Sequence, residues 1–141
     1  MALVITPFFH AATGTYAYLV ADDASRDAVI IDPVLDFDPA SGRVETLFAD
    51  ALLAEVHQRG LAVGWILETH VHADHLTAAA YLRAELPGAR VGVGVGVTAV
   101  QRHFRDVFNL GEDFVADGQQ FDRLFADGER FDCGALAIEV L

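Results

Sequence analysis

The stretch Thr69–His75, with the sequence T-H-V-H-A-D-H, is the most informative part of this chain. It places three imidazoles and one carboxylate within six residues, at His70, His72, Asp74 and His75. Imidazole and carboxylate groups are the ligand types of zinc, iron and related metals. A polar loop with surface histidines would explain one histidine, but not three histidines and an aspartate in this register. The stretch therefore predicts a metal site.

An apolar segment, Ala62–Leu67, precedes this stretch and reads as a buried strand, because its apolar character is too continuous for a half-exposed one. A regular strand continuing onward would aim His70, His72 and Asp74 to one face. His75 would join them only if the chain turned into the next helix. We therefore predict that the four side chains cluster at the C-terminal end of this strand, as ligands do in other α/β sites.

The segments on either side alternate between strand-like and helix-like patterns. Two strands joined by a polar hairpin loop come first, at Thr15–Val20 and Ala28–Asp32. Apolar residues at helical spacing predict a helix over 44–59, with a buried face formed by Val44, Leu47, Phe48, Ala51, Leu52 and Val56. Three further elements are predicted: a helix over Leu76–Leu86, a strand over Arg90–Val97 and a last strand over Ala135–Leu141. This order predicts an α/β fold with mixed strand pairing.

Glycine alternates with valine along Arg90–Val97, at Gly92, Gly94 and Gly96. This alternation predicts a strand whose glycine face lies against another backbone. The spacing misses G-x-G-x-x-G, and no further glycine opens a helix, so a nucleotide-binding loop is not indicated.

The composition suits one folded, acidic domain. The chain has 141 residues, of which 53% are hydrophobic, and a net charge of −12. Such a surface should repel nucleic acid phosphates and anionic membranes. No apolar run is long enough to span a bilayer, and Met1–His10 has no features of a signal peptide. With Cys133 as the single cysteine, these features predict a cytoplasmic protein without an internal disulfide.

The stretch Thr69–His75 matches the T-H-x-H-x-D-H signature of the metallo-β-lactamase superfamily, which the chain resembles. Four segments around it are similar to the persulfide dioxygenase branch of that superfamily: Thr15–Leu19, Ala28–Asp36, Ile66–Leu82 and Phe121–Glu129. The resemblance covers nearly the whole chain. It implies the αββα sandwich of the superfamily, of which residues 1–141 would supply about the N-terminal half of a single domain.

The resemblance also implies an activity. Proteins of this branch use one Fe(II) ion and O₂ to convert glutathione persulfide to sulfite and glutathione. Two histidines and one aspartate hold the iron, an arrangement that leaves positions open for O₂ and substrate. His70 matches the first of these ligands. His72, Asp74 and His75 match positions that orient ligands in this branch and bind metal in relatives with two ions.

The chain departs from the family pattern at its end. The family's later histidine, in a Thr-Pro-Gly-His turn, and its bridging aspartate do not occur before Leu141. We therefore expect the chain alone to be inactive, to bind metal weakly and to form a homo-oligomer. The expected cause of association is the inner face of the sheet, with strands such as Ala28–Ile31 and Val63–Leu67, which would lack its apolar cover.

Two other functions remain open. A glyoxalase II-like thioester hydrolase would bind two metal ions such as zinc, one on His70 and His72 and the other on Asp74 and His75. A catalytically incomplete half-domain would have no activity of its own. Metal content separates the two enzymes, because the dioxygenase would hold one iron and the hydrolase two zinc or mixed ions.

Asp32 ends a predicted strand near the metal stretch, where its carboxylate could orient a ligand histidine or form an Asp-Pro turn. Three histidines without nearby ligand partners are expected to be surface or structural residues: His10, His57 and His103. Cys133 has no activating base beside it and is not expected to be a nucleophile. Three aromatic residues are expected in the core: Tyr16, Tyr18 and Trp65.

Overall fold

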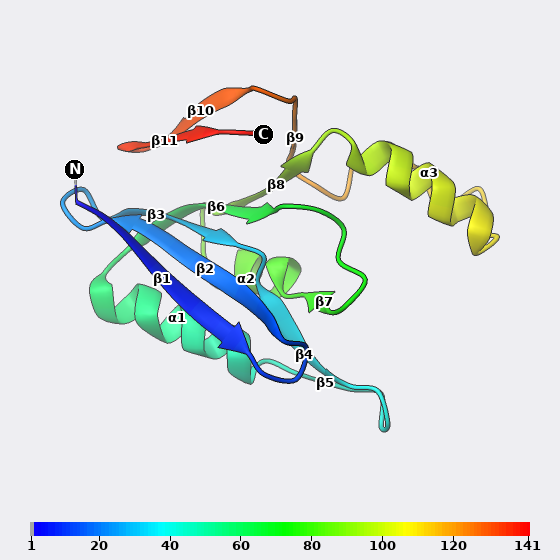
Figure 1. Ribbon diagram of the computed structural model, residues 1–141, viewed down its shortest axis with the longest axis horizontal. Helices are drawn as coiled ribbons and strands as arrows, with labels where there is room; N and C mark the ends of the chain where they lie inside the picture. Colours follow the sequence, from blue (N-terminus) through cyan, green and yellow to red (C-terminus); the bar gives the residue numbers. More distant parts are fainter. Residues whose placement is uncertain (1) are drawn as a thin grey trace.

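A mixed six-stranded sheet organises the chain. The computed structural model describes residues 2–141. The strands lie in the order β1-β2-β3-β6-β8-β9, antiparallel from β1 to β3 and parallel from β3 to β9 (Figure 1). Their bounds are Leu3–His10 (β1), Thr15–Asp22 (β2), Asp27–Ile31 (β3), Ala62–Glu68 (β6), Arg90–Gly94 (β8) and Arg123–Phe125 (β9).

Two smaller sheets and three helices complete the fold. β4 (Val34–Asp38) pairs with β5 (Arg43–Glu45) and with β7 (Leu76–Thr77), and β10 (Arg130–Cys133) forms a hairpin with β11 (Leu136–Glu139). The helices are α1 (Leu47–Arg59), α2 (Ala79–Glu85) and α3 (Val97–Val107). Within residues 2–141, no helix is both long enough and apolar enough to cross a membrane.

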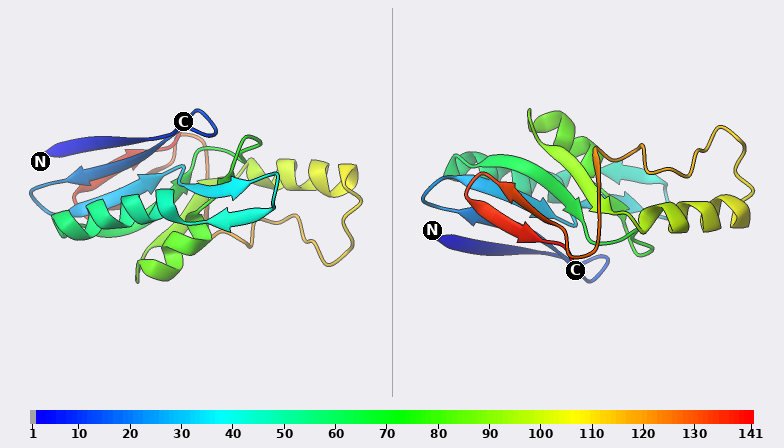
Figure 2. Two further views of the ribbon diagram at one scale, coloured as in Figure 1. Left: turned by 90° about the horizontal axis from the view of Figure 1, so that it is seen from below. Right: turned by 90° about the horizontal axis from the view of Figure 1, so that it is seen from above.

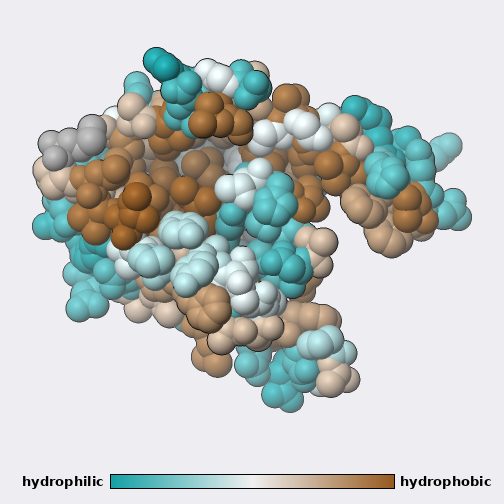
Figure 3. Space-filling model, viewed as in Figure 1, coloured by the Kyte–Doolittle hydropathy of each residue, from teal (hydrophilic) through white to brown (hydrophobic). Residues whose placement is uncertain are grey.

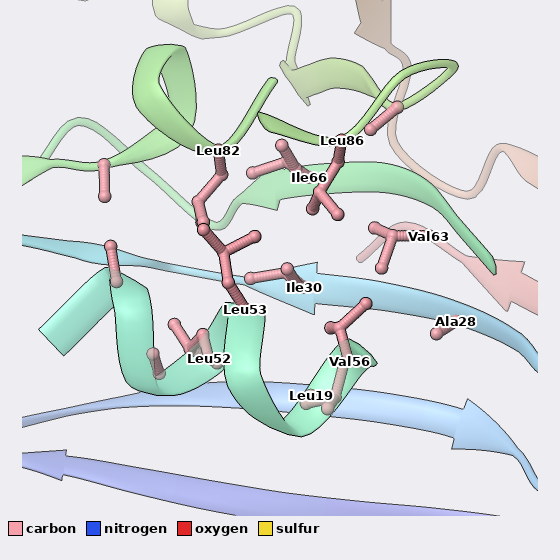
Figure 4. Close-up of a cluster of buried hydrophobic side chains, with 14 of the residues drawn as sticks. Leu19, Ala28, Ile30, Leu52, Leu53, Val56, Val63, Ile66, Leu82 and Leu86 are labelled. Atoms are coloured by element: carbon pink, nitrogen blue, oxygen red, sulfur yellow. The ribbon is translucent and has the colours of Figure 1, made fainter. Parts of the chain in front are cut away.

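The helices α1 and α2 cover one face of the large sheet (Figure 2). α1 buries a stripe at helical spacing, formed by Ala49, Leu52, Leu53 and Val56. The stripe packs with side chains of the sheet and of the α2 region, including Leu19, Ile30, Ile66, Leu82 and Leu86 (Figure 4). This layer fixes β6, whose C-terminal end leads into Thr69–His75, and β3, which ends beside it just before Asp32.

The β10–β11 hairpin covers part of the opposite face. The rings of Trp65, Phe125 and Phe131 pack together with centroids 4.3 to 5.6 Å apart. The backbone N–H of Ala135 donates to Asp27 Oδ2 at 2.8 Å, which ties the hairpin to the start of β3. β3 and β6 are therefore covered on both sides, and Trp65 is only 2% exposed. The prediction that the strands over 28–31 and 63–67 lack cover is wrong for Val29 and Trp65, which are buried, whereas Ile31 and Leu67 are half-buried.

The outer end of the same face is open. Ile5 and Phe9 of β1 lie across from β2, and both are exposed, as are Tyr16 and Tyr18. Figure 3 shows the apolar residues gathered on this side of the molecule. The prediction that both tyrosines are core residues is therefore wrong, whereas Trp65 lies in the core as predicted.

The helix predicted over 44–59 begins at Leu47, because Val44 lies in β5. Its predicted buried face is right for Leu52 and Val56 but wrong for Leu47 and Ala51, which are exposed. The helix instead buries a stripe that also includes Ala49 and Leu53.

Other predicted boundaries shift because of pairing and turns that the pattern did not reveal. Leu76 and Thr77 pair with β4, so the helix predicted over 76–86 begins only at Ala79. The strand predicted over 90–97 ends at Gly94 and the last strand covers Leu136–Glu139. Seven elements were not predicted: β1, β4, β5, β7, β9, β10 and α3.

The glycine face of β8 differs from expectation. A Cβ at Gly92 would meet the Phe125 ring at 2.5 Å, so this glycine lies against a side chain rather than a backbone. Gly94 and Gly96 have open space around them.

Candidate metal centre

The stretch from Thr69 to His75 forms a loop between β6 and β7, at the C-terminal ends of the parallel strands β3 and β6. Its histidine rings gather, with centroids 4.2 Å apart for His70 and His72 and 4.2 Å apart for His72 and His75. Asp74 Oδ1 lies 3.1 Å from His75 Nδ1 and 3.9 Å from His72 Nδ1. The structure thus brings the four side chains together at the expected end of the strand.

His75 supplies the clearest indication of a missing ligand. Its side chain is 1% exposed, and neither ring nitrogen has a hydrogen-bond partner. The short contact with Asp74 Oδ1 lacks the geometry of a hydrogen bond. Burial, and after it the neighbouring His72, lowers the pKa of His75 and favours a neutral imidazole with a free lone pair. Buried polar atoms are seldom left unpartnered, so this ring fits a metal ion.

Asp32 holds the loop from the neighbouring strand. Its carboxylate accepts from the Thr69 N–H at 2.7 Å and from the Thr69 hydroxyl at 2.6 Å, and its Oδ1 lies 3.0 Å from His72 Nε2. The residue has a φ of 51°, in the left-handed region, where aspartate is tolerated better than most residues. Asp32 therefore forms the turn before Pro33 and also touches a candidate ligand.

These contacts assign the protons of two rings. The Asp32 carboxylate accepts only, so His72 Nε2 carries the hydrogen and Nδ1 is the nitrogen free to bind a metal. The Thr69 hydroxyl gives its hydrogen to Asp32, so it accepts from His70 Nδ1 at 2.8 Å. His70 then has Nε2 free for ligation. The Asp32 carboxylate thus helps to orient both rings. It contacts His72 directly and His70 through the Thr69 hydroxyl.

Glu68, the last residue of β6, is a part of the site that sequence reasoning missed. Its Oε2 lies 3.1 Å from His72 Nε2, and its Oε1 accepts from the Thr77 hydroxyl. Burial raises the pKa of Glu68 to about 7. The sequence did offer one signal for Glu68. A charged residue directly after an apolar strand is expected to be buried, and a buried charged residue needs specific partners.

Two groups of candidate ligands have their donor atoms within 4.8 Å of one another in residues 2–141. The first group is His72, Asp74 and His75, and the second is Asp32, Glu68 and His72. Neither group includes His70, although its ring lies beside that of His72. The donor set of imidazoles and a carboxylate suits zinc or iron.

Two clefts flank the loop. One, of ≈ 530 Å³, lies between the loop and the β1–β2 turn, and His10, Leu35, Phe37, His72 and His75 are among the residues that line it. The other, of ≈ 220 Å³, opens on the opposite side, against Val93 and Phe121. The loop can therefore be reached from both sides.

The remaining expectations concern residues away from the loop. His10 is buried rather than on the surface, with Nε2 2.9 Å from Asp36 Oδ1, and is a structural histidine in the cleft wall. His57 and His103 are exposed. Cys133 is buried, and burial raises the pKa of its thiol, which opposes a nucleophilic role as expected.

Known proteins match nearly the whole chain, including the loop from Thr69 to His75. The family described as the metallo-beta-lactamase superfamily matches residues 11–140. A probable metallo-hydrolase of Burkholderia pseudomallei is 48% identical over 99% of this chain and 47% of its own length. Glyoxylase B2 of Dictyostelium discoideum is 40% identical over 97% of this chain and 46% of its own length. The mitochondrial persulfide dioxygenase ETHE1 of Bos taurus is 40% identical over 62% of this chain and 30% of its own length.

Solved structures are similar along nearly the whole chain. ETHE1 from Myxococcus xanthus superposes with a TM-score of 0.69 and 28% identity, covering 96% of this chain and 46% of that one. The B3 metallo-beta-lactamase BLEG-1 superposes with a TM-score of 0.64 and 21% identity, covering 96% and 59%. The chain thus spans about half the length of the Burkholderia pseudomallei and Dictyostelium discoideum relatives.

Proposed function

Because the chain belongs to the metallo-β-lactamase superfamily, we propose that it is the N-terminal part of a glutathione-dependent persulfide dioxygenase that uses one Fe(II) ion. The chain has the α/β metallo-β-lactamase fold, so the fold class expected from the sequence is confirmed. In this proposal residues 1–141 belong to a single domain, and the other iron ligands come from the rest of a longer protein.

The observation that carries a metal-dependent activity is the buried, unpartnered ring of His75 beside Asp74 and His72. The likeness to ETHE1 from Myxococcus xanthus, which extends over nearly the whole chain, supports the dioxygenase. The flanking segments that resemble the persulfide dioxygenase branch support the same choice.

The residues of the loop would have two roles, binding the iron and orienting the residues that bind it. His70 would hold the iron through Nε2, since its Nδ1 donates to Thr69. His72, Asp74 and His75 would orient the ligands and shape the surroundings of the ion. The ion would supply the activation of O₂. His70 lines the cleft of ≈ 220 Å³ and not the larger one, so we assign the approach of glutathione persulfide to the smaller cleft.

A metallo-hydrolase with two ions is the second candidate. The grouping of His72, Asp74 and His75 favours it, because these residues can bind a metal themselves instead of only orienting ligands. The probable metallo-hydrolase and the glyoxylase among the relatives support this reading. His70 and His72 would then serve one ion, and Asp74 and His75 the other.

Metal analysis combined with oxygen uptake separates these functions in the longer protein. The dioxygenase should contain one iron per chain and consume O₂ when given glutathione persulfide. Two zinc or mixed ions per chain, with thioester hydrolysis and no O₂ uptake, would establish the hydrolase and refute the dioxygenase.

His70→Ala tests the assignment of the ligand. It should abolish iron binding, because it removes one of only three protein ligands. The exposed His103 supplies the control, since His103→Ala should keep full iron content. Full iron occupancy in His70→Ala would refute the role of His70.

A further inference from the structure

We propose that Glu68 is a positioning residue that fixes the ring of His72 with Nδ1 free for a metal ion. This inference rests on the second candidate function proposed above, in which His72 is itself a metal ligand. It concerns a residue that is outside the signature stretch and has no ligand role in that function.

Both oxygens of Glu68 are engaged beneath the loop. The side chain is 4% exposed, and Oε2 lies 3.1 Å from His72 Nε2. The other oxygen accepts from the hydroxyl of Thr77, whose strand β7 pairs with β4. The carboxylate therefore cannot rotate without breaking one of these contacts, and its direction is set by two strands.

His72 is held by two carboxylates from different strands. Asp32, at the end of β3, and Glu68, at the end of β6, both approach Nε2, at 3.0 Å and 3.1 Å. Turning the ring over would bring a carbon atom to both carboxyl groups and would take away the one N–H that they share as acceptors. The pair therefore keeps Nε2 protonated and leaves Nδ1 on the side of Asp74 and His75.

A purely structural role for Glu68 makes a different prediction. A buried carboxylate is costly to place in a strand end unless it has specific partners. If Glu68 served only to anchor Thr77, its loss would lower stability but leave the ring of His72 unchanged. The tautomer of His72 therefore distinguishes positioning from anchoring.

Nitrogen NMR of the imidazoles in the metal-free protein reads this tautomer directly. We expect the neutral form of the His72 ring in the unaltered protein to carry its hydrogen at Nε2. Glu68→Leu should raise the share of the Nδ1-protonated tautomer, because Nε2 then keeps only Asp32 of its two acceptors, while Glu68→Gln, whose amide oxygen can still accept, should keep the original tautomer. The control is Asp22→Leu, which removes another buried carboxylate, one that accepts from the N–H groups of Ala2 and Ala24, and should not affect His72.

Chelator competition with Zn²⁺ gives a second measurement. Glu68→Leu should weaken binding by about 10- to 100-fold, the usual effect of losing a group that orients a ligand, and Glu68→Gln by less. Protonation of His72 at Nδ1 in the unaltered protein would overturn the proposal even if the variants fail to fold. An unchanged tautomer in folded Glu68→Leu would also overturn it. If NMR finds the expected tautomer but the protein binds no Zn²⁺, the metal-binding function is refuted. The positioning of the His72 ring by Glu68 then still stands.

Discussion

The Asp32 carboxylate meets three donors from one loop: the Thr69 N–H, the Thr69 hydroxyl and His72 Nε2. It reaches them from a backbone with a φ of 51°, where a β-branched or bulky residue would be strained. The conformation of this single residue therefore fixes both the direction of the chain into Pro33 and the orientation of the loop.

Asp32→Asn should weaken metal binding more than it weakens the fold. Asparagine tolerates the left-handed conformation, so the turn should persist. Its amide group keeps one acceptor oxygen and presents N–H donors to Thr69 or His72, so one ring loses its orientation. We expect an affinity loss of about 10- to 100-fold in chelator competition, with a small change in thermal stability.

Asp38→Asn is the matched control for this variant. It removes a carboxylate that accepts from Ser41 and Ala40 in the turn between β4 and β5, away from the loop. Equal losses of metal affinity in the two variants would show that Asp32 has no special role.

The sequence reveals the ligand-type residues but only part of their support. His70, His72, Asp74 and His75 could be found because they lie within six residues. Glu68 could not be assigned, because its contact with Thr77 depends on the pairing of β7 with β4. The two proton assignments required the positions of individual oxygens.

At the scale of elements, Gly92 in β8 is required by its neighbours. An added Cβ would lie 2.5 Å from the Phe125 ring and 3.3 Å from the Trp65 ring, in the aromatic cluster under the hairpin. Gly94, two residues later on the same strand, has nothing within 4 Å of such an atom.

Gly92→Ala should therefore destabilise the fold by about 1–3 kcal/mol, the usual cost of overpacking a core. Gly94→Ala should be neutral or slightly stabilising, because alanine loses less backbone entropy on folding. Denaturant unfolding of both variants measures the difference. Equal stabilities would mean that Phe125 moves aside without cost.

Elements that depend on a partner were the hardest to predict. The Val-Gly alternation over residues 90–97 suggested one strand, but the chain turns into α3 after Gly96. Only Val97 of α3 is buried, so this helix has little core to identify it. β4 and β7 are short and gain their structure from pairing with each other.

At the scale of the whole molecule, the open face of β1 and β2 is the feature with the largest consequence for behaviour in solution. Ile5 is 58% exposed and Phe9 is 54% exposed. Apolar patches of this kind tend to find partners, and β1 is an edge strand with unpaired backbone groups.

We expect this chain alone to self-associate through that face. Ile5→Glu combined with Phe9→Glu should shift the mass measured by light scattering toward the monomer. Salt should strengthen association of the unaltered chain, because it screens the repulsion that a net charge of −12 produces.

Leu47→Glu provides the control, because Leu47 is 71% exposed but lies in the helix layer on the other side. This variant should have the mass of the unaltered chain. A monomeric unaltered chain at high salt would contradict the assignment of this face.

The hydrogen bond between Asp27 and Ala135 joins residues 108 positions apart. During synthesis, Asp27 leaves the ribosome long before its partner exists. At about 5–20 residues per second, the interval is roughly 5 to 20 s. Until the hairpin is made, Val29, and Trp65 once it has been synthesised, have no hairpin above them, so the nascent chain exposes this apolar surface. Once β10 and β11 have been synthesised, their hairpin covers β3 and β6 and lowers the risk that these strands misfold.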